Sequence, residues 1–376
     1  MALVLSLALS SCASTAEAPD PSGATAVPVT ITDRTARELS DVLATQSAAV
    51  RFKDLAAFQR TIDGTRLAFR RCEAQFFDTA ARRGGTTLIP GRVLSVEPYH
   101  LTYARAWVGE DAYGYVPVYF RRDAADHWIV TEPTADELGG EQQRTIDGVA
   151  VEYWGVDDAV IEAYAASAVK ARNAAAAVAP RPTTTPWSLR ILPTREAVGV
   201  SGSCGTAADS SGQTYRIRTF PDALRLDRSL RKATAQTDAL FLHEALHQVQ
   251  YAFIPKITVR LDWWLIEGWP DNVAQTTPVA EIRSNVCAPA VPTFKQLVDG
   301  PRLEADTPPE VQGQYYSYAN TMIGYLTETY GKNAYWDLVS LYQDEVDPQK
   351  NYPKALRVTP EAFYSGWLTW AKKKYC

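Results

Sequence analysis

The sequence has little of what several large classes of protein require. Acidic residues outnumber basic ones slightly, the formal net charge is −5, and no basic patch dominates, so a nucleic-acid-binding protein is not expected. The apolar run at residues 2–9 is too short to span a bilayer as a helix. A hydrophobic content of 46% and a charged content of 22% are ordinary for globular proteins. These values exclude a disordered, collagen-like or coiled-coil chain.

Histidine and cysteine are both scarce. In 376 residues there are only four histidines, at positions 100, 127, 243 and 247. There are five cysteines, at positions 12, 72, 204, 287 and 376. The length predicts two domains with enough chain to bury a sizeable core, so the placement of these few reactive side chains carries most of the chemical information.

The first residues have the pattern of an export signal. Residues 2–9, ALVLSLAL, resemble the hydrophobic region of a secretory signal. They lead into LSSC at residues 9–12, which resembles the lipobox of bacterial lipoproteins. That resemblance implies cleavage before Cys12 and lipid attachment to it, hence membrane anchoring at the cell envelope, outside the cytoplasmic membrane or in the periplasm. Residues 13–33 are rich in Ala, Ser, Thr and Pro, which predicts a flexible tether.

The remaining cysteines predict disulfides. With Cys12 lipidated, four are left, and an even number in an exported chain favours two disulfides over buried free thiols. Three pairings are possible. We prefer Cys204 with Cys287, because both flank the candidate site described below, which leaves Cys72 with Cys376.

Residues 34–148 are expected to form an N-terminal α+β domain of unknown role. Residues 34–62 and 66–82 have the spacing of amphipathic helices. Short alternating segments then predict antiparallel strands at 92–96, 99–104, 115–120 and 127–130. In topology the domain resembles the small cone-shaped domains of the nuclear-transport-factor or cystatin type, a likeness that implies no activity.

A polar stretch at residues 134–148 with Gly139-Gly140 indicates a boundary, and residues 149–376 are expected to form the second domain. Its predicted elements are a long alanine-rich helix at 157–179, strands at 187–192 and 214–219, and mostly helix from Asp238 onward. The segment 198–205 precedes the helical part and is expected to line the cleft as a loop or edge strand.

The strongest chemical signal is HEALH at residues 243–247, inside a segment with clear helical periodicity. On a helix, His243 and His247 project side by side, because residues four apart are neighbours. Two neutral imidazoles at this spacing can bind one Zn²⁺. Glu244 lies on the adjoining flank, where it can reach a water held by the metal. Half of the histidines in the chain lie in this motif.

A catalytic zinc site has three protein ligands and leaves one position for water. No other histidine is near, so the third ligand is expected to be a carboxylate. Glu267 follows His247 with nineteen residues between them, in WLIEG at residues 264–268. H-E-x-x-H followed by W-L-x-E-G resembles the gluzincin metallopeptidases. Within them it is closest to the peptidase MA-like group, relatives of the aminopeptidase N and leukotriene hydrolase enzymes.

The resemblance implies a mostly helical, thermolysin-like peptidase domain with a small edge sheet. It implies that His243, His247 and Glu267 bind one Zn²⁺ per chain and that Glu244 is the general base. It also implies that Asp271 accepts the N–H of a ligand histidine and fixes its tautomer. The alternative is that Asp271 is a solvated charge on a helix.

A tyrosine that stabilises the oxyanion is implied in the same way. Residues 314–331 resemble the family segment in which a tyrosine precedes a Y-L-x-x-x-x-G helix. Tyr316 matches that tyrosine, and Tyr318 is the alternative if the register differs by two.

The chain departs from the family pattern in two places. Pro270 stands where the family has a helix former, and proline in a helix removes a hydrogen bond, so we expect the helix to begin late or to bend. The G-x-M-E-N segment that recognises a free amino terminus in the aminopeptidases is missing. Its absence argues against specificity for a free amine.

The sequence therefore predicts a zinc metallopeptidase that hydrolyses bonds in a peptide or protein substrate. The alternative is a catalytically inactive, peptidase-like module for surface binding or assembly, although the intact Glu244 favours the enzyme. A structural zinc site is disfavoured by the two-histidine, one-glutamate ligand set. His100 and His127 fall in predicted strands and are expected to be ordinary core or surface histidines.

Overall fold

A computed structural model describes much of the chain. The described residues are 33–82, 92–100, 102–111, 114–133, 137–180, 186–191, 207–211, 214–219, 224–254, 261–301 and 309–376. The lipobox with Cys12, nearly all of the tether, the segment 198–205 and Cys204 lie outside them, so the predictions made there stay predictions. None of the helices in the described ranges is long and apolar enough to cross a membrane.

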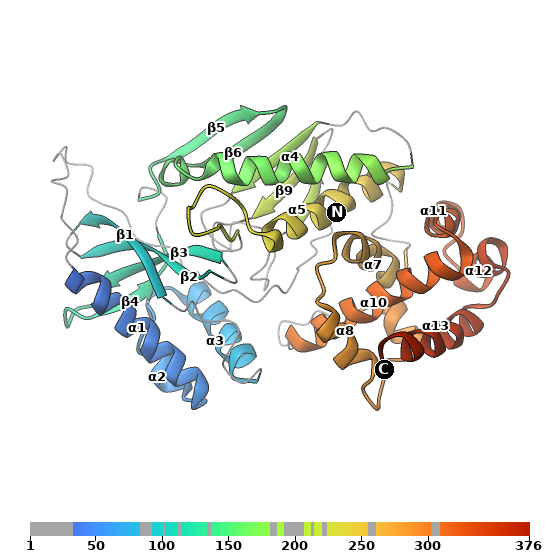
Figure 1. Cartoon of the computed structure of the whole chain (residues 1–376), viewed down its shortest axis with the longest axis horizontal. Coiled ribbons are helices and arrows are strands. Elements are labelled where there is room, and N and C mark those ends of the chain that lie inside the picture. The colour runs from blue at the N-terminus through green and yellow to red at the C-terminus, as the bar shows by residue number, and fades with distance from the viewer. Residues whose placement is uncertain are drawn as a thin grey trace.

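The N-terminal part has the expected order of helices followed by strands (Figure 1). The helices are α1 (Asp33–Arg51), α2 (Leu55–Gln59) and α3 (Leu67–Arg82). An antiparallel sheet follows, in the order β1 (Arg92–His100), β2 (Tyr103–Glu110), β3 (Gly114–Arg122) and β4 (Trp128–Thr131). The α+β class is thus confirmed.

Two details of the N-terminal prediction were wrong. The single helix at 34–62 is interrupted at Lys53, whose φ of 57° is left-handed, so that α1 and α2 are separate helices. The strand at 99–104 does not form, because the chain turns between His100 and Tyr103, which pair across β1 and β2. Alternation of apolar side chains continues through such a turn and does not reveal it.

The strand β2 is buried on both faces. Ala104, Ala106 and Val108 pack into a core formed with the first three helices. On the opposite face, the buried Arg105 forms an ion pair of 2.6 Å with the buried Asp157, which lies in the predicted second domain. The first sheet and the predicted second domain are therefore held together by contacts that include this buried ion pair.

The second sheet has five strands. Their order is β5 (Glu141–Ile146), β6 (Val149–Trp154), β7 (Trp187–Ile191), β9 (Thr214–Thr219) and β8 (Ala207–Ser211). The first two strands form an antiparallel hairpin whose turn contains Asp147 and Gly148, both with positive φ. The predicted boundary at residue 148 falls inside this hairpin. The division between the two sheets therefore lies between Thr131 and Glu141.

Two helices pack side by side on this sheet (Figure 1). After the short 3-10 helix η1 (Gly155–Asp157), α4 (Ile161–Val178) packs against β5, β6 and β7, whereas α5 (Ala235–Phe253) packs against β8 and β9. Buried alanines at 163, 165, 168, 171 and 175 leave α4 little side-chain bulk on its inner faces, which lets α5 approach closely.

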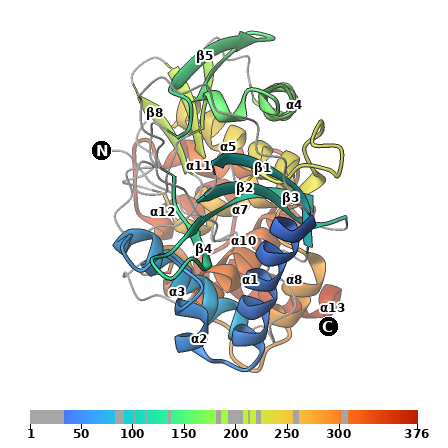
Figure 2. The ribbon, with the colours of Figure 1, turned by 90° about the vertical axis from the view of Figure 1, so that its left-hand side faces the viewer.

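From Ala235 onward the described residues are mostly helical, as expected. Its helices are α7 (Trp263–Ala274), α8 (Val279–Val286), α9 (Phe294–Asp299), α10 (Pro309–Tyr330), α11 (Ala334–Leu341), α12 (Pro348–Leu356) and α13 (Pro360–Tyr375). These helices lie beside the second sheet and its helices (Figure 1). Seen from the side of the first sheet, β5 and α4 lie at the opposite end of the molecule from α2 (Figure 2). Trp264 and Trp269 stack on Phe363 and Tyr335 within the core.

The preferred disulfide pairing was wrong. Cys287 is bonded to Cys376, with 5.7 Å between their Cα atoms. The bond forms because α8 and α13 both pack against α10, which brings the end of α8 to the C-terminus of the chain. Cys72 is disulfide-bonded as well, so its thiol is not free.

Candidate metal centre

The helix α5 carries the two histidines of the motif. Its N-terminal cap is Thr234, whose hydroxyl accepts a hydrogen bond from the backbone N–H of Thr237. Leu246 and Val249 anchor the helix in the core. The histidines occupy the next stripe around the helix, and both are 0% exposed. A stable, buried helix thus fixes the direction of both imidazoles.

Three ligand atoms converge between α5 and α7. The Nε2 atoms of His243 and His247 face each other across 3.0 Å. The Oε2 atom of Glu267 lies 3.6 Å from each of them. Ligands about 2.0–2.1 Å from a tetrahedral Zn²⁺ are separated by ~3.3 Å, so the three spacings bracket the required value. These side chains form a buried group that could hold one metal ion.

Glu267 reaches this point because α7 and α10 pack very closely. A Cβ atom on Gly268 would lie 2.5 Å from the carbonyl oxygen of Ala319 in α10. Only glycine allows that approach. The glycine of the WLIEG segment therefore sets the position of the third ligand against the helix that carries Tyr316.

The charges of the three ligands are strongly coupled. Burial alone would raise the pKa of the Glu267 carboxyl, but the two histidines outweigh burial and lower it to about 2. Burial opposes protonation of His247, yet the negative charge of Glu267 raises the pKa of its imidazole. Burial lowers the pKa of His243. An ionised carboxylate beside two imidazole nitrogens is a ligand set suited to a divalent cation.

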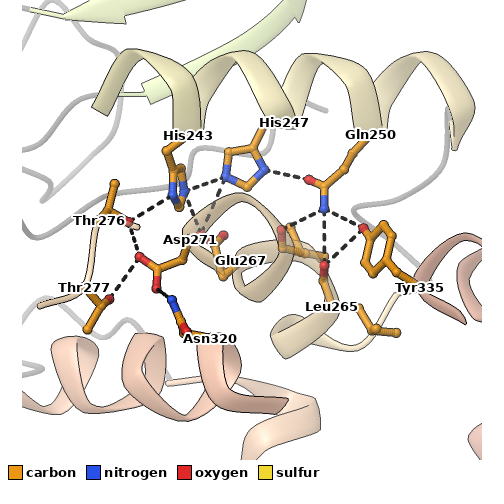
Figure 3. Close-up of polar contacts among 11 residues, drawn as sticks. His243, His247, Gln250, Leu265, Glu267, Asp271, Thr276, Thr277, Asn320 and Tyr335 are labelled. Carbon is orange, nitrogen blue, oxygen red and sulfur yellow. Dashed lines mark hydrogen bonds and ion pairs between the residues drawn. The ribbon is translucent and has the colours of Figure 1, made fainter. Parts of the chain in front are cut away.

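Gln250 fixes the tautomer of His247 (Figure 3). Its Nε2 donates to the carbonyl oxygens of Leu265 and Ile266, at 3.2 and 2.9 Å. Those carbonyls only accept, so the amide oxygen must face His247, where it lies 2.8 Å from Nδ1. Nδ1 therefore carries a proton, and the Nε2 lone pair points toward Glu267.

Pro270 explains why the Ile266 carbonyl is available. In a helix this oxygen would accept from the backbone N–H of residue 270, and proline has none. The helix α7 nevertheless runs through Pro270 without starting late. Gln250 supplies the missing donor. Pro270 thus leaves free an acceptor that α5 uses to orient His247, a candidate metal ligand.

Asp271 is connected to His243 through the hydroxyl of Thr276. Its Oδ1 accepts hydrogen bonds from the hydroxyls of Thr276 and Thr277, and its Oδ2 accepts from Asn320 at 2.6 Å. The Thr276 oxygen lies 3.5 Å from Nδ1 of His243. Because that hydroxyl gives its proton to Asp271, its lone pair faces the histidine (Figure 3). Asp271 is 1% exposed and acts on His243 through Thr276, not by the direct contact that was expected.

Glu244 is buried beside the candidate ligands. Both carboxylate oxygens lack a hydrogen-bond partner in the part of the chain that the structure describes. Burial raises the pKa of the Glu244 carboxyl to about 8. A carboxyl with a pKa near neutrality and unused lone pairs is suited to take and return a proton.

Of the two candidate tyrosines, Tyr316 lies near the ligands. Its ring centroid is 6.2 Å from that of His243 and 5.2 Å from that of Trp263. Burial raises the pKa of the Tyr316 phenol well above its usual value, and the charge of Glu267 adds to the shift. Tyr318 instead donates to the carbonyl oxygen of Asn285 at 3.1 Å. The geometry therefore favours Tyr316 over Tyr318 as the phenol that serves the site.

The other two histidines lie elsewhere. His127 is exposed, with Nδ1 3.8 Å from Asp123, and His100 ends β1. Sequence reasoning missed Gln250, Thr276 and Asn320. Gln250 stands three residues after His247, a spacing that places it on the same side of the helix. Thr276 meets His243 through the packing of α7 on α5, and Asn320 meets Asp271 through the packing of α10 on α7. Local spacing reveals neither contact.

Comparison with known proteins finds no family model that matches the chain and no similar curated protein.

Proposed function

We propose that this chain is a zinc-dependent metallopeptidase. The observation that carries the proposal is the convergence of two imidazole Nε2 atoms and one carboxylate beside a second carboxylate that has no hydrogen-bond partner among the described residues. Two histidines and one glutamate are a ligand set typical of catalytic zinc, with the fourth position left for water or substrate. Residues His243, His247 and Glu267 would hold the ion.

A bound Zn²⁺ would supply a Lewis acid that acidifies a coordinated water and polarises a carbonyl. Glu244 accepts the proton that the water loses as its oxygen attacks the amide carbon. Glu244 then returns that proton to the amine that leaves when the C–N bond breaks. The products are a carboxylic acid and an amine, so one water is consumed for each bond.

The Tyr316 phenol donates a hydrogen bond to the oxygen that gains negative charge during the attack. Its raised pKa keeps the proton on the phenol at neutral pH, as a donor requires. A preorganised donor of this kind is commonly worth a few kcal/mol in the transition state. Asp271 and Gln250 hold the two imidazoles in the tautomer that leaves Nε2 unprotonated for the metal.

The fold supports an extended substrate. Within the described strands β8 is the edge of its sheet, and it packs against the helix that carries Glu244. The outer edge of such a strand offers backbone groups to which an extended peptide can pair. This arrangement favours a peptide over a compact small molecule as the substrate.

The test is digestion of a peptide library by the zinc-loaded protein, read by mass spectrometry. We expect cleavage that a chelator abolishes and added zinc restores. The Glu244→Gln variant should keep its zinc and lose at least a hundredfold in rate, because a general base contributes roughly 10²–10⁴-fold.

The matched control is Glu361→Gln, the same chemical change at an exposed site on α13. It should cleave like the wild type. Full activity in Glu244→Gln, or a zinc-loaded wild type that cleaves nothing in the library, would contradict the proposal.

A further inference from the structure

Two glutamines on α5 stand two residues apart and behave in opposite ways. Gln248 and Gln250 are both 0% exposed. Gln250 uses its amide oxygen and nitrogen in bonds to His247, two backbone carbonyls and the hydroxyl of Tyr335. Neither the Nε2 nor the Oε1 of Gln248 has a hydrogen-bond partner in the part of the chain that the structure describes. Burying an unpaired amide is costly, and native proteins contain few.

The position of Gln248 indicates what its amide is for. It lies one helical turn after Glu244, so the two side chains share one face of α5. The carboxylate oxygens of Glu244 also lack partners among the described residues. His243, His247 and Gln250 occupy the side that faces α7, where their hydrogen bonds are made (Figure 3). The side chains of Glu244 and Gln248, whose polar atoms have no partner among the described residues, thus lie one after the other along α5.

The chemistry of the amide points to one class of ligand. A carboxamide offers an N–H donor and a C=O acceptor, and one residue of an extended peptide offers its own C=O and N–H on the same side in return. A carboxylate or phosphate would leave Oε1 unpaired, and an apolar group would leave both atoms unpaired. Both polar atoms of Gln248 are satisfied together by the backbone N–H and C=O of one residue in an extended peptide.

We propose that Gln248 is a substrate-binding residue that pairs with the backbone N–H and C=O of one substrate residue near the scissile bond. This inference rests on the proposed peptidase function. One helical turn places Gln248 about 6 Å along α5 from Glu244, and an extended peptide advances about 3.4 Å per residue. The residue that Gln248 binds is therefore about two residues from the bond that is cut.

The test compares Gln248→Met with Gln250→Met, two substitutions of the same size and chemistry. Gln248→Met should keep its zinc, and its thermal midpoint should equal or exceed that of the wild type, because an unpaired amide is removed. Its KM for a fluorogenic peptide, built on the best-cleaved library sequence, should rise about tenfold, with a smaller change in kcat. Gln250→Met should lose both stability and zinc.

A second readout uses substrates in which an ester replaces one backbone amide at a time. The ester two residues from the scissile bond should raise KM for the wild type and leave KM for Gln248→Met unchanged. Loss of stability in Gln248→Met like that in Gln250→Met would show a structural role and overturn the inference. Kinetic constants equal to those of the wild type would overturn it as well.

Failure of the proposed function gives a different result. If the zinc-loaded wild type cleaves no library peptide, both the proposed peptidase function and the proposed role of Gln248 are wrong. That result needs no variant. A wild type that cleaves, with an indifferent Gln248→Met, leaves the peptidase in place and removes only the role of Gln248.

Discussion

Gln250 donates a hydrogen bond to the carbonyl oxygen of Ile266 across 2.9 Å, between two helices. The acceptor is free because Pro270, four residues later, has no N–H to offer it. The same amide accepts from Nδ1 of His247. The backbone hydrogen bond that Pro270 removes from α7 is thereby linked to the protonation state of His247, a candidate metal ligand on α5.

Replacing Pro270 tests this link. In Pro270→Ala the restored N–H competes with Gln250 for the Ile266 carbonyl, so the amide is held less firmly. We expect the affinity for zinc to fall about tenfold, the lower range for changes to groups that hold a ligand. Competition with a fluorescent chelator measures it. Pro353→Ala is the control, since Pro353 also lies inside a helix but in α12. Equal zinc affinity in both variants would contradict the link.

Thr276 and Thr277 form a second matched pair. Both hydroxyls donate to Oδ1 of Asp271, but only Thr276 reaches His243. Thr276→Val should leave Nδ1 of His243 without an acceptor and weaken zinc binding about tenfold. Thr277→Val should bind zinc nearly as the wild type does. The same chelator titration compares them, and a larger loss in Thr277→Val would rule out the role of Thr276.

Substitutions at Tyr316 and Tyr318 test which of the two phenols stabilises the oxyanion. Tyr316→Phe should lower kcat about a hundredfold with little change in stability, because it removes one oxyanion donor. Tyr318→Phe should keep kcat. Its free energy of unfolding should fall by about 1 kcal/mol, because the hydrogen bond to the carbonyl oxygen of Asn285 is lost. Steady-state kinetics and thermal unfolding decide between them. The reverse pattern would assign the phenol to Tyr318.

Zinc binding should release protons in a pH-dependent way. Because the pKa of Glu244 is raised to about 8, its carboxyl is mostly protonated at pH 7 before the metal binds. A nearby dication favours the carboxylate, so the proton leaves on binding. Calorimetry in buffers of different ionisation enthalpy should count close to one proton fewer for Glu244→Gln than for the wild type at pH 7. The difference should shrink as the pH rises past about 8. An equal count at pH 7 would mean that Glu244 is already ionised.

The parts of this protein that depend on neighbours in sequence were predictable. The spacing of His243 and His247 on one helix face is a local property, and so is the helical C-terminal half. The disulfide depends on how α8 and α13 meet over α10, which no spacing of cysteines encodes. The contact of Gln250 with Ile266 likewise depends on the packing of two helices. Pro270 was visible as an anomaly, but its use became clear only with the acceptor that it frees.

The central claim is that His243, His247 and Glu267 form one zinc site with Glu244 outside the ligand set. Elemental analysis of metal content tests it most directly, with Glu267→Gln and Glu244→Gln as equivalent changes at two buried glutamates. The account predicts one zinc per chain in the wild type and in Glu244→Gln, and loss of zinc in Glu267→Gln after dialysis against a weak chelator. Full zinc in Glu267→Gln, or its loss in Glu244→Gln, would contradict the account.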